Sequence, residues 1–119
     1  TRSFQSMNYK VRFTEQARQD LDDIFTYYST EFSENIAKKV ITSLQQTSNL
    51  LTLSPEGGIN FDHKIGYSLY PGNTLRMIVS KQYLLFYLVH EKEVHILRII
   101  NSRTDYLNQL DHLFHHIQD

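Results

Sequence analysis

The chain has 119 residues, a length typical of one globular domain, and 40% of them are hydrophobic. It contains no cysteine, which excludes disulfide bonds, cysteine-based zinc sites and thiol catalysis. The formal net charge of −1 excludes an overall electrostatic attraction to nucleic acid. No apolar run is long enough to cross a bilayer and no signal peptide is visible, so we expect a cytoplasmic protein without a membrane partner.

The N-terminal segment divides at Met7. Residues 1–6 have no structural pattern, and a Phe-Gln-Ser sequence before a methionine is typical of a cloning or protease-site remnant. We therefore expect residues 1–6 to lie outside the fold and residues 7–119 to form a single domain. At its start, residues 9–13 alternate between apolar and basic side chains, which predicts a half-buried strand.

Two amphipathic helices follow this strand. The first is predicted over residues 15–32 with Thr14 as its N-cap, and the second begins after Ser33 and ends at the turn-forming sequence of residues 54–58. A short junction between two such helices predicts an antiparallel hairpin whose shared apolar stripe packs on the strands. The stripe comprises Ala17, Leu21, Ile24, Tyr28 and Phe32, then Ile36, Val40, Leu44 and Leu51, with Tyr27 and Tyr28 along the seam of the hairpin.

Three strands are predicted in the second half of the chain, after an irregular loop over residues 59–73 with one short strand near residues 68–70. The strands cover residues 75–79, 83–89 and 94–100, joined by connections of hairpin length. The middle strand is apolar on both faces, which indicates a central position in the sheet. In the last strand, simple alternation assigns Val94, Ile96, Arg98 and Ile100 to one face.

A terminal helix is predicted after the last strand, capped by Thr104 or Asp105. Its apolar positions are Leu110, Leu113, Phe114 and Ile117. His112, His115 and His116 have spacings that a metal could use, but no carboxylate accompanies them, so we expect neither a metal site nor a cofactor. The element order predicts an α+β fold: an N-terminal strand, an α-helical hairpin packed on an antiparallel sheet whose last three strands form a meander, and a short C-terminal helix.

Charge is distributed unevenly along the chain. Residues 14–53 hold six acids and three bases, whereas residues 64–103 hold six bases and two acids. A nearly neutral total therefore conceals an acidic helical hairpin and a basic sheet. If the protein contacts a polyanion, we expect the sheet to do so.

Two motifs resemble the ParE/RelE superfamily, the toxins of bacterial type II toxin–antitoxin systems. The first is Y-x-x-F-Y at residues 83–87, which is similar to the central strand of that family. The second is I-L-R-I-I-x-S-R-x-D-Y at residues 96–106, which is similar to its last strand and the turn that follows. The resemblance covers roughly residues 9–110. It implies a growth-inhibiting toxin that is neutralised by direct binding of a cognate antitoxin, and the superfamily contains two mechanisms.

RelE-like members are metal-independent endoribonucleases that cut mRNA on the ribosome. Such chemistry needs a base, an acid and cations around the phosphate. In this chain the resemblance suggests Arg103, Tyr106 and Arg76 for those roles. The sequence departs from the nuclease pattern at Leu84, where an arginine is usual, and it lacks paired lysines on the first meander strand. His90, His95 or Glu93 would have to complete the site.

ParE-like members bind DNA gyrase and poison it, which requires a binding surface rather than a catalytic group. We favour this function, with gyrase or antitoxin binding assigned to Arg76, Lys81, Arg98, Arg103 and Asp105. We also expect an antitoxin segment to cover the sheet edge and the helical hairpin beside Arg76 and Arg103, because unpaired edges bind other chains.

Structural roles remain open for several of these residues. Arg76 and Arg98 are also explained by ion pairs with acids of a helix or of the C-terminal segment, and Asp105 by an N-cap. Tyr83, Phe86 and Tyr87 are best explained as core residues. A third hypothesis is a non-toxic homologue that only binds a partner.

Overall fold

The computed structural model describes residues 8–114, so the expectations for residues 1–6 and for His115, His116 and Ile117 lie outside the described part of the chain. The helices are α2 (Glu15–Glu31), α3 (Glu34–Asn49), α4 (Phe61–Ile65) and α5 (Leu110–Phe114), with 3-10 turns at Leu50–Thr52 and Tyr106–Asn108. The strands are β1 (Lys10–Phe13), β2 (Ile59–Asn60), β3 (Arg76–Ser80), β4 (Tyr83–His90) and β5 (Glu93–Asn101). Within residues 8–114 no helix has the length and apolar character that crossing a membrane requires.

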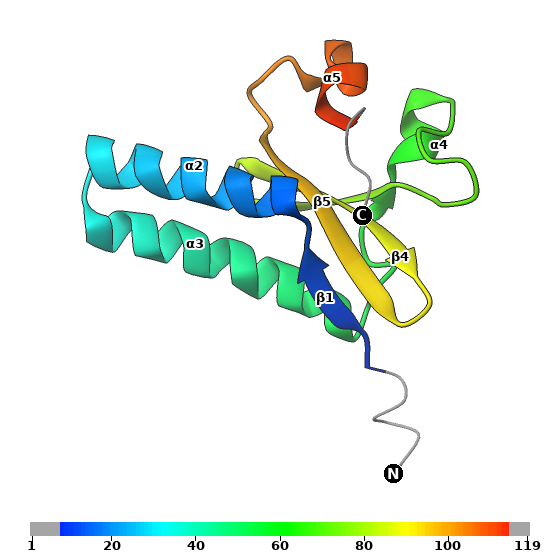
Figure 1. The fold of residues 1–119 in the computed structure, drawn as a ribbon, viewed down its shortest axis with the longest axis horizontal. Coiled ribbons are helices and arrows are strands. Elements are labelled where there is room, and N and C mark those ends of the chain that lie inside the picture. The colour runs from blue at the N-terminus through cyan, green and yellow to red at the C-terminus, as the bar shows by residue number, and fades with distance from the viewer. Residues whose placement is uncertain (1–7, 115–119) are drawn as a thin grey trace.

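The five strands form one sheet in the order β1-β5-β4-β3-β2, with β3, β4 and β5 as an antiparallel meander and β1 parallel to β5. The antiparallel helices α2 and α3 contact this sheet through β5 and β3, whereas α4 and α5 lie on the other side of it (Figure 1). The predicted α+β architecture is therefore confirmed.

The helical hairpin begins where the sequence predicts. The Thr14 hydroxyl accepts a hydrogen bond from the Ala17 amide, and the Ser33 hydroxyl accepts one from the Ile36 amide, so both N-caps are formed. Thr14 also joins the helix to the sheet, because its own amide donates to the Ile96 carbonyl and its hydroxyl donates to the Leu97 carbonyl. These contacts fix the direction in which α2 leaves β1.

Strand β4 is central and covered on both faces, as predicted. Its side chains alternate between two buried clusters, one under the helical hairpin and one under α4 and α5. The hairpin-side core includes Leu44, Leu51, Tyr83, Leu85, Tyr87, Val94, Ile96 and Ile99. The opposite-side core includes Phe61, Leu75, Met77, Leu84, Phe86, Leu97, Ile100, Leu110 and Phe114.

The alternation predicted for β5 is correct as far as Leu97 and wrong beyond it. The pairing with β4 shifts between Phe86 and Tyr87, so β5 contains one extra residue at this point. Because a bulge reverses the order of the faces, Ile96 and Ile99 both join the hairpin-side core, whereas Leu97 and Ile100 join the opposite-side core. A prediction that assumes strict alternation assigns the residues beyond such a bulge to the wrong face of the sheet.

Two further predictions are wrong in detail. The short strand after the hairpin lies at residues 59–60, not near residues 68–70, and it is followed by α4. The predicted short C-terminal helix is present, but within residues 8–114 this segment divides into a 3-10 turn and the separate helix α5. Asp105 makes no capping hydrogen bond to the backbone, and its carboxylate instead accepts from the side chain of Asn108.

Candidate binding site

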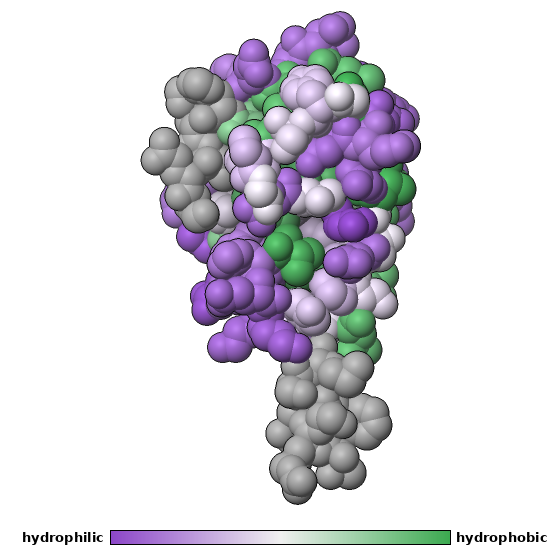
Figure 2. All heavy atoms as spheres, turned by 90° about the vertical axis from the view of Figure 1, so that its right-hand side faces the viewer, coloured by the Kyte–Doolittle hydropathy of each residue, from purple (hydrophilic) through white to green (hydrophobic). Residues whose placement is uncertain are grey.

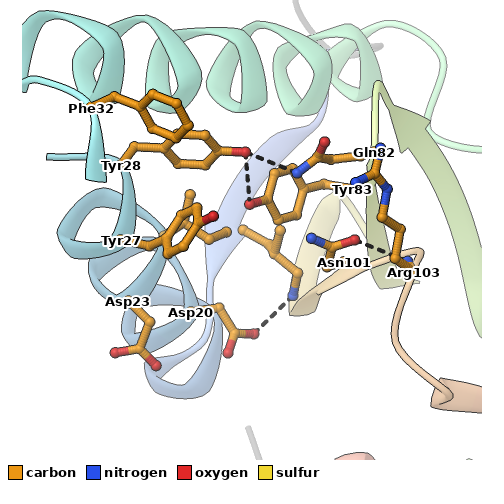
Figure 3. A pocket seen from close by; sticks show the side chains of 11 residues that line it. Asp20, Asp23, Tyr27, Tyr28, Phe32, Gln82, Tyr83, Asn101 and Arg103 are labelled. Carbon is orange, nitrogen blue, oxygen red and sulfur yellow. Dashed lines mark hydrogen bonds between the residues drawn. The ribbon is translucent and has the colours of Figure 1, made fainter. Parts of the chain in front are cut away.

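An open hollow of about 590 Å³ lies between α2 and the ends of β4 and β5. Helix α2 contributes Asp20, Asp23 and Ile24 together with two tyrosines, and Phe32 follows the end of the helix. The sheet side consists of Gln82, Tyr83, Ile99, Asn101 and Arg103 (Figure 3). The hollow lies at the end of the sheet where Tyr83 pairs with Asn101. Its volume is in the range of sites that hold several side chains of a peptide or a small molecule.

The floor of the hollow contains polar side chains that contact one another through the Tyr28 hydroxyl. The Gln82 side-chain amide donates to the Tyr28 hydroxyl at 2.8 Å, and the Tyr83 hydroxyl lies 3.5 Å from the same oxygen. Burial raises the pKa of Tyr83 to about 12, and the hydrogen bond to Tyr28 acts in the same direction. Tyr83 is therefore neutral at physiological pH, and it serves as a packed wall rather than as a general base.

One wall of the hollow is unusually apolar for an exposed surface. Tyr27 and Phe32 are 55% and 63% exposed, although both rings contact Tyr28, at centroid distances of 5.0 and 5.7 Å. The sequence-based assignment of Tyr27 to the hairpin seam and of Phe32 to the buried stripe is therefore wrong. Helical periodicity predicts the face of α2 on which a side chain lies. It does not predict that the sheet stops short of the end of the helical hairpin where Tyr27 and Phe32 lie.

Two charged groups mark the opposite rims of the hollow. Asp23 extends from α2 and accepts a hydrogen bond from Gln19 at 3.0 Å, while Arg103 extends from the segment after β5. The backbone amide of Arg103 donates to the Asn101 side chain, which fixes the turn. Among residues 8–114 the Arg103 guanidinium makes neither an ion pair nor a hydrogen bond, so it is free to bind a carboxylate or phosphate group.

Lys81 lies at the same end of the sheet as Arg103. It is exposed and occupies the two-residue turn between β3 and β4 with a φ of +55°. The neighbouring Gln82 carbonyl accepts a hydrogen bond from the Ser102 amide, so this turn is attached to the segment that carries Arg103. Two of the five predicted binding residues are thus brought to one end of the sheet.

Arg98 has a structural environment. Its guanidinium donates two hydrogen bonds to the Asp20 carboxylate, at 2.9 and 3.0 Å, and a third to the Leu113 carbonyl. Asp20 is mostly buried and also accepts from the Ile99 amide at 2.8 Å. The ion pair therefore joins α2, β5 and α5, as the structural alternative for Arg98 predicts.

Arg76 is also engaged within the chain. It lies on β3 opposite Tyr87, and its guanidinium donates to the Gly58 carbonyl at 3.2 Å. The Gly58 amide donates to the Tyr87 hydroxyl at 2.9 Å, and burial raises the pKa of that tyrosine. Because Arg76 lies four residues before Ser80 at the β3–β4 turn, it is about 13 Å along the strand from the Lys81 end.

The proposed nuclease residues are not brought together. Tyr106 packs against Phe61 and Phe86 in the opposite-side core, whereas Arg103 lines the hollow on the hairpin side. Leu84, at which the nuclease pattern predicts an arginine, is 4% exposed and lies in the same opposite-side core. Asp105 is exposed next to Tyr106, and its carboxylate accepts a hydrogen bond from the Asn108 side chain.

The remaining basic residues do not form one continuous surface. Lys92 lies over the Tyr9 ring at the β4–β5 turn, which is the opposite end of β4 from Lys81. At that end Glu93 accepts from Arg12 and lies 3.2 Å from His95, and the hydrogen bond from Arg12 lowers the pKa of Glu93. In the described part of the chain, no three His, Asp or Glu side chains are grouped closely enough to hold a metal ion.

Sequence reasoning missed most of the hollow. One signal was present for Asp20, because it lies three residues after Ala17 and four before Ile24, on the apolar face of the helix. An acid at such a position indicates a buried cationic partner. Gln82 and Asn101 carry no comparable signal, since their role follows only from the register that places the two strand ends side by side.

Most of the chain matches the model of a known protein family. The family model described as the ParE toxin of the type II toxin–antitoxin system parDE matches residues 11–106. This range includes all but the first residue of β1, the helical hairpin, the meander and all the lining residues of the hollow. No curated protein sequence matches the chain.

Among solved structures, one match is a chain of the chromosomal ParDE toxin–antitoxin system from P. aeruginosa. Its TM-score is 0.66 at 22% sequence identity, and the alignment covers 82% of this chain and 99% of that chain. At this identity the likeness establishes the fold, and the family assignment rests on the family model.

Proposed function

This chain belongs to the family of ParE toxins of type II toxin–antitoxin systems, and on that premise we propose that it stops growth by binding and poisoning DNA gyrase. A cognate antitoxin neutralises it by direct binding in the bacterial cytoplasm. Residues 7–119 form the toxin domain. The action on gyrase is that of a bound protein that traps the enzyme on DNA, with no chemical step performed by this chain.

We favour gyrase over mRNA cleavage because the residues suggested for a nuclease site lie far from one another. RNA cleavage through the 2′-hydroxyl needs its acid, base and cations within hydrogen-bond reach of one phosphate. Arg103 lies at the hollow, Arg76 is bound to the Gly58 carbonyl, and Tyr106 packs on the other face of the sheet. Leu84 provides no polar group.

The surface for the target lies at the Lys81–Arg103 end of the sheet. Both cations are exposed, and the Gln82–Ser102 hydrogen bond holds their two segments together. Charged groups on a firm backbone favour fast, oriented association with an oppositely charged partner. Arg98 acts as a support for this surface rather than as a contact, because its guanidinium is used inside the chain. Arg76 and Asp105 lie outside the surface.

The sheet edge provides a place for the antitoxin. Strand β2 pairs only with Met77 and Arg76 of β3, so residues 78–80 of β3 form part of an open edge. Val79 on this edge is 57% exposed. An extended segment of the antitoxin that adds to this edge would satisfy its backbone groups and cover the apolar side chain.

The test uses purified full-length protein in gyrase supercoiling and DNA-cleavage assays. We expect loss of supercoiling and accumulation of gyrase-linked broken DNA, both prevented by prior addition of the antitoxin. Arg98→Lys serves as a stability control, because loss of the two-pronged ion pair should lower the melting temperature as well as the activity. Unaffected gyrase together with codon-phased mRNA cuts after induction would instead establish a RelE-like ribonuclease. Normal growth on expression without antitoxin would establish a non-toxic partner-binding homologue.

A further inference from the structure

The two turns at the Lys81 end of the sheet present two cations, and we propose that these turns form a clamp for one carboxylate group of the target protein. In this clamp Lys81 and Arg103 bind the carboxylate, and Asn101 is a positioning residue that fixes the backbone of Arg103. The inference rests on the proposed function and deepens it, because it names the chemistry by which the toxin recognises gyrase.

The pairing of the strands brings the two cations to opposite positions. Beyond the end of β5 the Ser102 amide donates to the Gln82 carbonyl at 2.7 Å, so the antiparallel pairing of β4 and β5 continues into both turns. The next position in this register is Lys81 on one turn and Arg103 on the other, and both residues are exposed. Side chains at opposite positions of an antiparallel pair lie close enough to interact. Both cations can therefore reach a single acidic side chain.

Asn101 holds the turn that carries Arg103. Its side-chain oxygen accepts the Arg103 amide at 2.9 Å, and its carbonyl accepts both the amide and the hydroxyl of Thr104, at 3.0 and 2.7 Å. These hydrogen bonds fix the backbone of the turn, while the Arg103 guanidinium makes no ion pair or hydrogen bond among residues 8–114. A group that is held in place before binding loses less conformational freedom when it binds.

Lys81 occupies a backbone conformation that lysine adopts only at a cost. Its φ is +55°, in the left-handed region that favours glycine. Glu91, in the turn at the other end of β4, has the same φ, and its carboxylate lies 3.7 Å from the His90 ring. Within residues 8–114 the Lys81 ammonium makes no such ion pair. An unfavourable conformation at an exposed residue without an internal partner points to a functional side chain.

The surroundings of the clamp favour one acidic side chain over the phosphates of DNA. A DNA backbone presents a continuous row of phosphates, and binding it needs a continuous stripe of cations. Asp23 on the opposite rim of the hollow and Asp105 two residues after Arg103 would repel such a row. Lys92 lies at the other end of β4, on the side of the molecule that Figure 2 shows, where the surface is largely hydrophilic with apolar residues interspersed. Two cations around one carboxylate form strong, charge-assisted hydrogen bonds.

A pair of matched glycine variants tests the role of Lys81. Lys81→Gly and Glu91→Gly each remove a side chain from a left-handed turn position, so neither should lower the melting temperature. In a supercoiling assay with purified gyrase and relaxed plasmid, full-length Lys81→Gly should inhibit about tenfold more weakly than the wild type, because one charge-assisted contact is lost. Glu91→Gly and the charge-conserving Lys81→Arg should each inhibit within about threefold of the wild type.

A double-mutant cycle tests the role of Asn101. Asn101→Ala removes the acceptor of the Arg103 amide and should weaken gyrase inhibition about tenfold, whereas Asn101→Ser keeps an oxygen that can accept this amide and should restore most of it. Because Asn101 acts through Arg103, the double variant Asn101→Ala/Arg103→Ala should be no weaker than Arg103→Ala alone. Melting temperatures show that each variant is folded, and a general loss of stability would make the two losses add.

Four results would overturn the inference. Wild-type inhibition by Lys81→Gly would remove the clamp, and additive losses in the double variant would remove the positioning role, while the proposed function would stand in both cases. Weaker binding of Lys81→Gly to the gyrase–DNA complex, with unchanged binding to gyrase alone, would assign the cations to a DNA phosphate. Absence of gyrase inhibition by the wild type would remove the proposed function, and the clamp with it.

Discussion

Asp20 in α2 and Arg98 in β5 form a two-pronged ion pair whose side chains are only 11% and 16% exposed. The same carboxylate accepts the Ile99 amide, on the stretch of β5 that continues past its pairing with β1. Asp20 therefore satisfies a backbone amide of β5 that a neighbouring strand would otherwise satisfy. The ion pair also positions α2, which forms one wall of the hollow.

Removing the carboxylate should be strongly destabilising. Asp20→Ala leaves a mostly buried guanidinium and the Ile99 amide without their partner, so we expect unfolding by urea to require about 3–5 kcal/mol less free energy. The double variant Asp20→Ala/Arg98→Met should cost less than the sum of the single changes, because no buried charge remains. The control is Glu15→Ala, which removes an exposed partner of Arg18 and should cost less than about 1 kcal/mol. Additive losses in the double variant would contradict a direct coupling of the two residues.

Gly58 should not tolerate a methyl group. A Cβ at this position would lie 2.6 Å from the Met77 carbonyl oxygen and 2.8 Å from the Tyr87 hydroxyl, both parts of the contact that holds β2 against β3. We expect Gly58→Ala to lower the unfolding free energy by about 1–3 kcal/mol. Gly57→Ala is the matched control, because its Cβ would lie 3.1 Å from the Ser54 carbonyl oxygen and 3.6 Å from the Ser54 Cβ. Equal stabilities of the two variants in urea denaturation would show that β2 moves freely aside.

The elements that the sequence predicts well are those whose signals are local. Thr14 and Ser33 are followed by amphipathic helices, and both form their N-caps, so the hairpin begins at the predicted positions. The β4 strand is apolar on both faces and lies between two cores, because a central strand has no exposed face.

The elements predicted poorly depend on tertiary contacts. The bulge in β5 shifts the register at Leu97, and no residue type in that segment marks it. Asn60 is both the N-cap of α4 and the last residue of β2, and a strand of two residues gives too little alternation to be recognised. For the site, a family motif indicates Arg103. Helical periodicity places Phe32 in the core, because periodicity predicts the face of a helix and not how far the sheet beneath it extends.

The hydroxyl of Tyr106 should be dispensable for growth inhibition. The ring packs against Phe61 and Phe86 at centroid distances of 6.4 and 6.1 Å, so Tyr106→Phe keeps the packing and removes only the hydroxyl. We expect unchanged gyrase inhibition and unchanged toxicity. A general acid or base contributes roughly 10²–10⁴-fold to a reaction. A loss of toxicity of that size in a variant with wild-type melting temperature would therefore identify a ribonuclease.

Alkaline pH should destabilise the protein through Tyr83. Its pKa is raised to about 12 by burial and then by the hydrogen bond to Tyr28, whereas in the unfolded chain the pKa is near 10. Between these values the unfolded chain has released the proton and the folded protein retains it, so the unfolding free energy falls as pH rises from 10 to 12. The contribution is complete below pH 10 and is lost above 12.

Replacement by phenylalanine isolates this effect. Tyr83→Phe should flatten the decline of the unfolding free energy between pH 10 and 12, measured by urea denaturation at several pH values. Tyr70, whose pKa burial also raises to about 12, should account for part of the slope that remains, and Tyr70→Phe should reduce it further. Tyr83 is 7% exposed and forms one wall of the hollow, so ionisation there requires the helix and the strand end to separate. An identical alkaline slope in wild type and Tyr83→Phe would show that the hollow admits water to the hydroxyl without unfolding.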